Sequence, residues 1–255
     1  MIKPILTVAV PSYNHGEFLD FALESIFMQD VPVEVFVMDG GSTDDTCQVI
    51  KKWEPHLAGW RSHVDDGQSA AINEGIALGS APFVTWLNSD DYYLPNGLKV
   101  LIAALEAKPD APVAYGRAFH EKAETAKRRA AWVQPFTAKT LALRCIICQP
   151  AALIRRSAWE SVSGTDPSLH MTMDYDLWWR LYRHSGDFVF VDHPVAINRD
   201  HASTKTNENR KLHYSEAIST VRTHYGSVPL KWYLYQPYAV WWKSIVGSLR
   251  RYRIK

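Results

Sequence analysis

Short apolar runs alternate with helical periodicity over the first 116 residues. Residues 5–10 are apolar, partly β-branched and followed by Pro11, which predicts a buried strand. The next apolar positions share one helix face: Leu19, Ala22, Leu23, Ile26 and Phe27. The same alternation predicts strands at residues 33–38, 60–64, 83–87 and 113–116, and helices at residues 43–53, 68–78 and around 98–105. This pattern is typical of a parallel α/β sheet with helices on both faces.

The pattern becomes less regular after residue 117. It predicts an exposed hairpin or loop at 117–129 and shorter elements at 137–144, 150–154, 157–163 and 188–191. Stronger helices are predicted at residues 174–184 and 205–225. No internal repeat is visible, and 255 residues suit one large domain. We therefore expect a single domain with halves at residues 1–116 and 117–206, followed by a helical extension at residues 207–255.

Polar turn residues follow four of the predicted strands. They stand at residues 11–14, 39–42, 65–67 and 88–91, and three of these segments carry carboxylates. Loops are generally polar, so any one of them has an ordinary explanation. Ligands of parallel α/β sheets bind beyond the carboxyl ends of the strands. The four segments together therefore predict a polar site at that edge.

Composition narrows the class of protein. Hydrophobic residues make up 47% and charged residues 22% of the chain, which is ordinary for a globular protein and excludes a disordered one. No apolar run reaches the length of about 18 residues that a membrane span needs. The start of the chain lacks a small-residue cleavage site, so we expect no signal peptide. Three cysteines suit a reducing compartment, and we interpret Cys145 and Cys148 as small buried residues.

Two adjacent carboxylates, Asp90 and Asp91, follow a predicted strand in the sequence Asn-Ser-Asp-Asp. Adjacent carboxylates repel one another unless a cation lies beside them, and Mg²⁺ or Mn²⁺ prefers oxygen ligands shared with phosphates. An alternative is a capping cluster for the helix after Pro95. Neither a P-loop sequence nor GxGxxG occurs, which excludes P-loop kinases and Rossmann dehydrogenases. The remaining interpretation is a phosphate-bearing ligand held by a metal and carboxylates.

Several segments, taken in order, resemble the family 2 glycosyltransferases, which are inverting, metal-dependent enzymes with the GT-A fold. The segments read TVAVPSYNHGEFLDFALESI, VMDGGSTDDT, DDGQSAAINEGIALG, FVTWLNSDD, QPAALIRRSAWESVSG, MDYDLWWRL and RDHASTKT. They span residues 5–206, and their order makes the set more specific than any one of them. The resemblance implies a nucleotide-sugar-binding half at residues 1–116 and an acceptor half at residues 117–206.

The resemblance implies donor and metal contacts at particular positions. Those assigned to the nucleotide are Pro11, Tyr13 and Asn14 around the base, Asp39 on the pyrimidine N3–H, Asp66 on the nucleoside, Asp90 on the ribose and Lys205 on phosphate. Asp66 is preferred to Asp65 because Gly67 follows it. Asp91 and His201 are assigned to Mn²⁺ or Mg²⁺, and a carboxylate at Asp39 favours UDP or dTDP as the nucleotide. Each assignment has an alternative in which the residue binds no ligand, such as a turn cap for Asp39 or a surface position for His201.

The resemblance also implies a catalytic base at Asp174. An attacking hydroxyl needs a general base as the phosphate leaves. Asp176 stands two positions further along and would face another way on a helix, so we interpret it as structural. Met173 occupies a position where the family more often has Glu, which weakens this part of the resemblance. Gln149 and Trp178 are the predicted acceptor contacts, with Trp132 and Trp179 as further candidates for stacking on a sugar.

The predicted activity is transfer of a sugar from a UDP- or dTDP-sugar to a hydroxyl of a saccharide or lipid-linked saccharide, in polysaccharide or lipopolysaccharide synthesis. Two alternatives stay open. A nucleotidyltransferase also uses a metal on an α/β sheet, but it normally has a Gly-rich triphosphate loop near its first strand. A non-catalytic nucleotide-sugar-binding subunit would have no chemical reason to retain Asp90, Asp91 and Asp174 together.

The C-terminal extension differs in charge from the rest of the chain. Residues 205–255 hold ten Lys or Arg against two Glu, and residues 229–255 hold no acid but many aromatic side chains. Such a segment suits the surface of an anionic membrane. The alternative is a helix that packs on the domain or on a partner, and the acidic body disfavours nucleic acid. We therefore expect a cytoplasmic protein that is peripheral on the inner face of the membrane.

Overall fold

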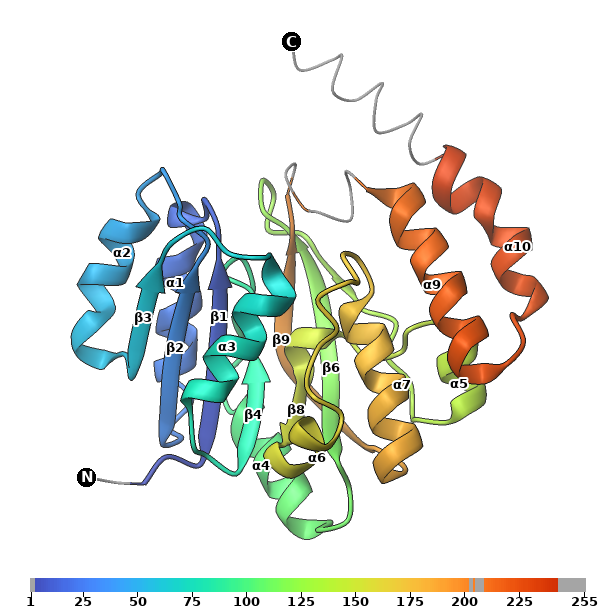
Figure 1. Ribbon diagram of the computed structural model, residues 1–255, viewed down its shortest axis with the longest axis horizontal. Helices are drawn as coiled ribbons and strands as arrows, with labels where there is room; N and C mark the ends of the chain where they lie inside the picture. The colour runs from blue at the N-terminus through green and yellow to red at the C-terminus, as the bar shows by residue number, and fades with distance from the viewer. Residues whose placement is uncertain (1–2, 202–203, 205–208, 243–255) are drawn as a thin grey trace.

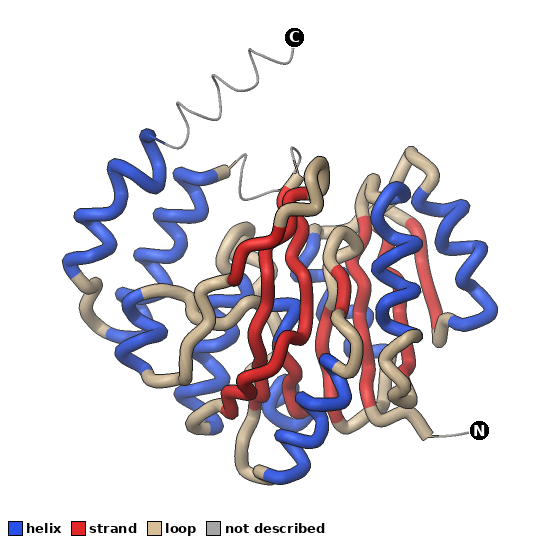
Figure 2. The backbone as a smooth tube through the Cα atoms, turned by 180° about the vertical axis from the view of Figure 1, so that it is seen from behind, coloured by secondary structure: helices blue, strands red, loops and turns tan. Residues whose placement is uncertain are grey.

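The computed structural model describes residues 3–201, 204 and 209–242, which form one mixed sheet with helices on both faces (Figure 1; Figure 2). The strands are β1 (Leu6–Ser12), β2 (Val33–Asp39), β3 (Gly59–Ser62), β4 (Phe83–Trp86), β5 (Tyr92–Tyr93), β6 (Val113–Lys122), β7 (Arg128–Ala130), β8 (Ala152–Arg155) and β9 (Val189–Asp200). The helices are α1 (Gly16–Phe27), α2 (Thr46–Trp53), α3 (Gln68–Leu78), α4 (Gly97–Ala107), α5 (Ala138–Leu143), α6 (Arg156–Ser161), α7 (Met173–Ser185), α9 (Arg210–Tyr225) and α10 (Leu230–Gln236). Short 3₁₀ turns η1 (Glu54–His56) and η2 (Gln149–Ala151) and the π-helical segment η3 (Pro237–Trp242) complete the described chain.

The strands lie in the order β3-β2-β1-β4-β8-β6-β9-β5, with β7 paired to β6. The first four strands of the chain pair in parallel, as the alternating pattern predicts. β8 runs antiparallel between β4 and β6, and β5 runs antiparallel to β9. The sheet is therefore parallel in its amino-terminal half and mixed in the other, which places the carboxyl ends of β1 to β4 on one edge, here called the carboxyl edge.

Two apolar layers cover the sheet because β1 is apolar on both faces. Leu6, Val8 and Val10 point to the layer formed with α1, α2 and α4, and Ala9 points to the layer formed with α3, α6 and α7. Every residue of β1 is buried, as expected for a central parallel strand. This packing fixes the carboxyl edge on a rigid base.

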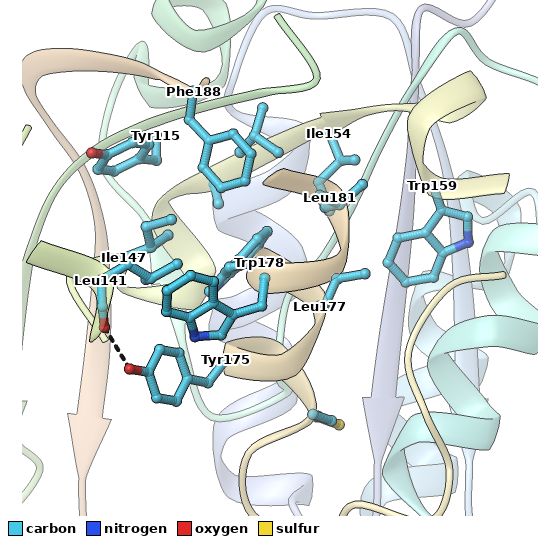
Figure 3. Packing of buried hydrophobic residues seen from close by; sticks show 14 of the residues in the cluster. Tyr115, Leu141, Ile147, Ile154, Trp159, Tyr175, Leu177, Trp178, Leu181 and Phe188 are labelled. Carbon is cyan, nitrogen blue, oxygen red and sulfur yellow. Dashed lines mark hydrogen bonds between the residues drawn. The ribbon is translucent and has the colours of Figure 1, made fainter. Parts of the chain in front are cut away.

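The second layer is rich in large aromatic rings. Trp178 of α7 is fully buried and stacks on Trp86 of β4 at 6.2 Å between ring centroids. Figure 3 shows this ring among its aliphatic and aromatic neighbours, with the Tyr175 hydroxyl donating to the Leu141 carbonyl oxygen. Hence α7, which carries the predicted catalytic residue, is anchored along its length in the core.

The acceptor half contains more strand than the sequence predicts. β9 covers twelve residues rather than the predicted four, because it pairs in parallel with β6 beyond residue 191 through an irregular register. The predicted hairpin or loop at 117–129 is the extension of β6 together with its partner β7. Pro194 and alternating polar residues mask this long pairing in the sequence.

Helices α9 and α10 both pack against the domain. Ala217 and Val221 of α9 are buried in the same apolar cluster as α7, and Val228 and Trp232 pack against it. Figure 1 shows α9 alongside α7, with α10 on the outer side. No helix among the described residues has both the length and the apolar character to cross a membrane.

Candidate active site at the carboxyl edge

Loops that follow β1, β2 and β4 meet at the carboxyl edge and hydrogen-bond to one another. The Asn14 backbone N–H donates to Ser42 Oγ at 2.7 Å, and the Thr43 N–H donates to Asn14 Oδ1 at 2.8 Å. Gln68, at the start of α3, donates to Asn88 Oδ1 at 2.8 Å. The polar segments that the sequence predicts at one edge are therefore physically connected.

An exposed ring and a carboxylate flank Gly40 at one end of this edge. A Cβ at Gly40 would lie 3.4 Å from Tyr13 Cδ2 and 3.7 Å from each carboxylate oxygen of Asp65. Tyr13 is 60% exposed, and Arg61 holds Asp65 through an ion pair of 2.9 Å. The absent side chain at Gly40 thus lets the Tyr13 ring and the Asp65 carboxylate lie close to one backbone position, an arrangement suited to a flat ring that carries an N–H.

Asp39 serves as an internal acceptor for its own loop. It is fully buried, and Oδ2 accepts hydrogen bonds from the Gly41 and Ser42 backbone N–H groups at 3.1 and 3.0 Å and from Ser62 Oγ at 2.6 Å. Its other oxygen accepts from the Ser42 hydroxyl. These bonds hold the buried carboxylate to its own loop and to the end of β3.

The other residues predicted around the base lie in different environments. Pro11 is buried inside β1, whereas Asn14 is exposed and adopts a left-handed conformation with φ of 52°. Asp66 is exposed, while its neighbour Asp65 is the carboxylate beside Tyr13. Lys205 lies outside the described residues.

Asp91 points into the protein, away from the edge. It is fully buried and accepts hydrogen bonds from Asn88 Nδ2, Asn198 Nδ2 and the Arg199 backbone N–H at 3.2, 3.1 and 2.9 Å. Burial, together with the charge of Asp90, raises its pKa well above the usual range. Asp91 therefore joins the turn before β5 to β9, because Asn88 lies in that turn and the other two donors lie on β9.

Asp90 points the other way and meets two histidines. His201 Nε2 lies 2.9 Å from Asp90 Oδ2, and this hydrogen bond raises the pKa of His201. One ligand atom each from His15, Asp90 and His201 lies within 4.8 Å of the others. We call these three residues the His–Asp–His cluster. Two imidazole nitrogens and a carboxylate oxygen form a donor set that fits a divalent transition-metal cation.

Asp174 and Asp176 occupy the first turn of α7 but have different partners. Asp176 accepts from Arg180 Nε at 2.6 Å and pairs with His224 Nε2 at 2.7 Å. Burial would raise the pKa of Asp176, but these two partners outweigh it and lower the pKa. Within the described chain, the Asp174 side chain accepts a hydrogen bond from the Tyr175 backbone N–H alone, at 2.8 Å, and burial raises its pKa to about 6. A carboxylate with that pKa can act as a general base near neutral pH.

Asp174 lies at the same edge as the Asp90–Asp91 pair. Burial raises the pKa of the Cys148 thiol, and the charges of Asp91 and Asp174 raise it further. The thiol therefore lies within the electrostatic reach of both carboxylates. In addition, Ser69 Oγ at the start of α3 lies 2.9 Å from Met173 Sδ, which joins the α7 turn to the donor-side loops.

The residues predicted to contact the acceptor differ in their burial and in their hydrogen bonds. Gln149 is buried and donates through Nε2 to the Trp86 carbonyl oxygen at 2.7 Å, while its buried Oε1 has no hydrogen-bond partner in the described chain. Trp178 has no exposed surface and cannot stack on a sugar in this conformation, so it belongs to the core. Trp132 is 56% exposed and lies beneath the Arg144 guanidinium.

Two residues of this edge, His15 and Asn88, are not among the residues that the sequence predicts at the site, and Asp65 is the alternative to Asp66. His15 follows the predicted Asn14, and Asn88 stands two positions before the predicted Asp90. The polar turns after the strands were a sufficient signal for their neighbourhood. The direction of each side chain was not available from the sequence.

Comparison with known proteins identifies similar sequences and folds. The family model described as Glycosyl transferase family 2 matches residues 7–162. A protein from Rickettsia prowazekii, described as an uncharacterized glycosyltransferase, is 27% identical over 218 residues, which cover 80% of this chain and 67% of that protein.

Two solved structures have the same fold. Residues 1–349 of Staphylococcus aureus TarS, in complex with UDP, match with a TM-score of 0.67 and 18% identity over 88% of this chain and 65% of that one. A mannosyltransferase from Pyrobaculum calidifontis, in complex with GDP-Man and Mn²⁺, matches with a TM-score of 0.65 and 18% identity over 98% and 74%. The chain thus spans about two thirds of the R. prowazekii protein and of TarS 1–349, and it has the GT-A fold.

Proposed function

The chain belongs to glycosyltransferase family 2, and from this membership we propose that it transfers a sugar from a nucleoside-diphosphate sugar to a hydroxyl of a saccharide or lipid-linked saccharide, with inversion, in the synthesis of cell-surface polysaccharide or lipopolysaccharide. The observation that carries the proposal is the carboxyl edge itself. The His–Asp–His cluster lies at this edge, and Asp174 is joined to it by the preceding residue, since Met173 Sδ lies 2.9 Å from Ser69 Oγ at the start of α3.

The nucleobase is proposed to lie between Tyr13 and Asp65. Tyr13 offers an exposed ring face for stacking. Asp65 accepts the Gly67 backbone N–H through Oδ1 and pairs with Arg61 through Oδ2, and its remaining lone pairs are the proposed acceptors for the N3–H of uracil or thymine. Cytosine has no hydrogen at N3, so this contact disfavours it. Asp39 supports the proposal indirectly, because its saturated carboxylate holds the loop that carries Gly40. UDP-sugars and dTDP-sugars are the proposed donors, and a guanine nucleotide is the competing outcome, since the P. calidifontis mannosyltransferase was solved with GDP-Man.

The diphosphate is proposed to lie beside Asp90 and His201. These residues fit a divalent cation, Mn²⁺ or Mg²⁺, because they present a carboxylate oxygen and an imidazole nitrogen side by side. When bound, such a cation supplies positive charge to the diphosphate leaving group. We place it on Asp90 rather than Asp91, because the oxygens of Asp91 accept from Asn88, Asn198 and Arg199.

Asp174 is proposed as the general base. Its carboxylate takes the proton of the acceptor hydroxyl as that oxygen attacks the anomeric carbon of the donor sugar. A new carbon–oxygen bond forms while the bond from that carbon to the diphosphate breaks, and attack from the opposite face inverts the anomeric centre. The environment suits this role, because burial raises the pKa of Asp174 to about 6 and leaves it ionised at neutral pH.

The acceptor is proposed to lie near Gln149 and Trp132. The buried Oε1 of Gln149 is an acceptor that a sugar hydroxyl could satisfy, and Trp132 has an exposed ring for stacking on a sugar face. Both features indicate a ligand with hydroxyl groups and flat apolar faces, which is the chemistry of a saccharide.

Turnover of a panel of nucleotide sugars tests the function. Release of the nucleoside diphosphate would be measured with each donor, with and without EDTA, for the unaltered protein and for Asp90→Asn and Asp174→Asn. We expect turnover with a UDP- or dTDP-sugar and a large loss in both variants. Asp187→Asn, an exposed carboxylate on the loop after α7, is the matched control and should retain full activity. Full activity in both site variants would refute the assignment.

The same assay separates the two rival functions. Pyrophosphate release from a nucleoside triphosphate and a sugar phosphate would indicate a nucleotidyltransferase. Binding of a nucleotide sugar, seen as thermal stabilisation, without transfer or hydrolysis would indicate a non-catalytic subunit. Neither outcome is expected, because a base with a raised pKa stands beside the donor edge.

The outer face of α10 is proposed to contact an anionic membrane on its cytoplasmic side. Leu230 and Leu234 are 69% and 73% exposed, and Tyr233, Tyr235 and Tyr238 are also exposed. Residues 229–255 contain six Lys or Arg and no acid, although residues 243–255 lie outside the described chain. Apolar and aromatic side chains beside basic residues match the interface of a membrane that carries negative charge.

Sedimentation with lipid vesicles tests this contact. The full chain should pellet with vesicles of phosphatidylcholine and phosphatidylglycerol, and less with phosphatidylcholine alone. Leu230→Gln with Leu234→Gln should weaken pelleting, whereas Met28→Gln, an equally exposed apolar residue at the C-cap of α1, should not. Equal pelleting by all proteins, or concentration-dependent self-association in place of vesicle binding, would contradict the proposal.

A further inference from the structure

We propose that His15 is a third protein ligand of the cation, so that the site holds two imidazoles and one carboxylate and prefers Mn²⁺ to Mg²⁺. The inference rests on the proposed function, because the cation would be the one beside the donor diphosphate. The inference adds a residue from the loop between β1 and α1, which is distant in sequence from both Asp90 and His201.

The position of His15 is the first support. The residue directly precedes α1, and its ligand atom lies within 4.8 Å of those of Asp90 and His201. Its ring meets that of His201 edge to face at 5.8 Å between centroids, and Phe18 packs against both rings. The three side chains therefore come from separate segments, at residues 15, 90 and 201, and converge on one small volume.

The orientation of His15 is the second support. Its Nδ1 lies 2.8 Å from Ser89 Oγ, and Ser89 is buried. A histidine that binds a metal usually hydrogen-bonds through its other ring nitrogen, which fixes the ring and the tautomer. Ser89 fills that role here if Nε2 is the ligand. The adjacent Asp90 then presents its carboxylate from the same turn.

The donor set predicts which cations bind. Mg²⁺ prefers oxygen ligands and retains water, whereas imidazole suits first-row transition metals. A site with one imidazole and one carboxylate discriminates weakly between Mn²⁺ and Mg²⁺. A second imidazole favours Mn²⁺ over Mg²⁺. It also lets the protein bind Mn²⁺ before any nucleotide is present.

Electron paramagnetic resonance of free Mn²⁺ measures this binding without activity. The full chain would be titrated with Mn²⁺ in the absence of nucleotide and then with competing Mg²⁺. His15→Ala and His15→Asn should each weaken Mn²⁺ binding by more than about tenfold. Loss of a residue that only hydrogen-bonds to a metal ligand already costs about that much, and loss of a ligand should cost more. Both variants should lose less Mg²⁺ affinity, so the preference for Mn²⁺ should shrink.

Asparagine at position 15 separates a ligand from a structural residue. Its amide can keep a hydrogen bond to Ser89 but has no atom in the place of Nε2. A structural role predicts that His15→Asn binds Mn²⁺ as the unaltered protein does, and that result would overturn the inference. His184→Ala, an exposed histidine near the end of α7, should have no effect. Thermal unfolding of each metal-free variant shows whether it is folded.

The outcomes distinguish this inference from the proposed function. Loss of Mn²⁺ binding in both His15 variants, with no sugar transfer by the unaltered protein, would support the cation site and refute the function. Sugar transfer by the unaltered protein, with unchanged Mn²⁺ binding in the His15 variants, would support the proposed function and refute the role of His15 as a ligand.

Discussion

Asp174 and Asp176 show how neighbouring residues of one type acquire different chemistry. Asp176 is paired with Arg180 and His224, and its pKa is lowered, so it stays ionised as a structural acceptor. Asp174 has no cationic partner among the described residues, and burial raises its pKa. Asp174, with the higher pKa of the two, is therefore the one suited to accept a proton from a substrate.

The pH dependence of transfer follows from the raised pKa of Asp174. The active form is the carboxylate, so kcat/KM should rise as the pH increases through about 6 and become constant above it. An unperturbed aspartate would place this limb near pH 4. Asp174→Asn should reduce kcat by about 10²- to 10⁴-fold and abolish the limb. A pH–rate profile checks both, and an acid limb that persists in Asp174→Asn would assign it to another group.

The Asp90–Asp91 pair separates into a residue that faces the edge and one that holds the fold. In Asp91→Asn, the new amide N–H would face the donors Asn88, Asn198 or the Arg199 N–H. We expect a loss of about 1–3 kcal/mol in the free energy of unfolding, because buried donors would lose their acceptor. Urea unfolding measures this loss.

Asp90→Asn is the comparison for that prediction. It should lose Mn²⁺ affinity with a smaller loss of stability, because the Asp90 side chain hydrogen-bonds to His201 alone among the described residues. If Asp91→Asn instead lost Mn²⁺ binding at unchanged stability, the assignment of the cation to Asp91 that the family resemblance implies would be the correct one.

At the scale of elements, α9 holds the start of α7 in place. The Glu216 carboxylate accepts the backbone N–H groups of Met171 and Thr172 at 2.8 and 3.1 Å and the Thr172 hydroxyl at 3.2 Å. A carboxylate at a helix N-terminus satisfies donors that the helix leaves open and complements its dipole. Glu216 is thus a positioning residue for Asp174, which lies in that first turn.

Removal of this carboxylate should affect both stability and turnover. Glu216→Ala should cost about 1–3 kcal/mol of unfolding free energy and lower kcat more than it raises KM, because Asp174 loses its fixed position. Glu216→Gln keeps one acceptor oxygen and should recover part of both losses. Glu106→Ala, exposed at the end of α4, is the control. A loss of stability with normal kcat would show that Glu216 has no part in positioning Asp174.

At the scale of the whole molecule, α9 and α10 share the core of the acceptor half. Trp232 donates through Nε1 to the Ala142 carbonyl oxygen at 2.8 Å, and its ring lies near those of Tyr175 and Tyr214. Ala217 and Val221 are buried against the same cluster. The described part of the predicted extension therefore packs as part of the domain, while the outer face of α10 stays exposed.

Shared packing predicts cooperative unfolding. Trp232→Ala should lower the free energy of unfolding by about 2–3 kcal/mol, somewhat less than for a fully buried tryptophan, and the transition should remain single. Hydrogen exchange of α7 and α9 should then weaken together. If α9 alone lost protection while α7 kept it, the C-terminal helices would be a separate folding unit.

Local pattern was enough to predict most of the parallel half. Strand β1 and helix α3 are specified by their own apolar spacing, which can be identified within a short stretch of sequence. Strand β9 was underestimated, because its length comes from pairing with β6, a segment about 75 residues away along the chain. The sequence predicts Trp178 as a sugar contact, but its ring is fully buried in the core. Residue type alone does not show which tryptophans are buried.

The sequence alone determined the family, the alternating elements and the edge at which polar turns gather, because these depend on residue type and order. Only the tertiary structure placed Asp65 beside Tyr13 and Gly40, and turned Asp90 towards His201 while Asp91 is buried. It also brought His15 to the cluster from another loop. The reason is that one step along a turn reverses the direction of a side chain, and partners from distant strands fix which direction is kept.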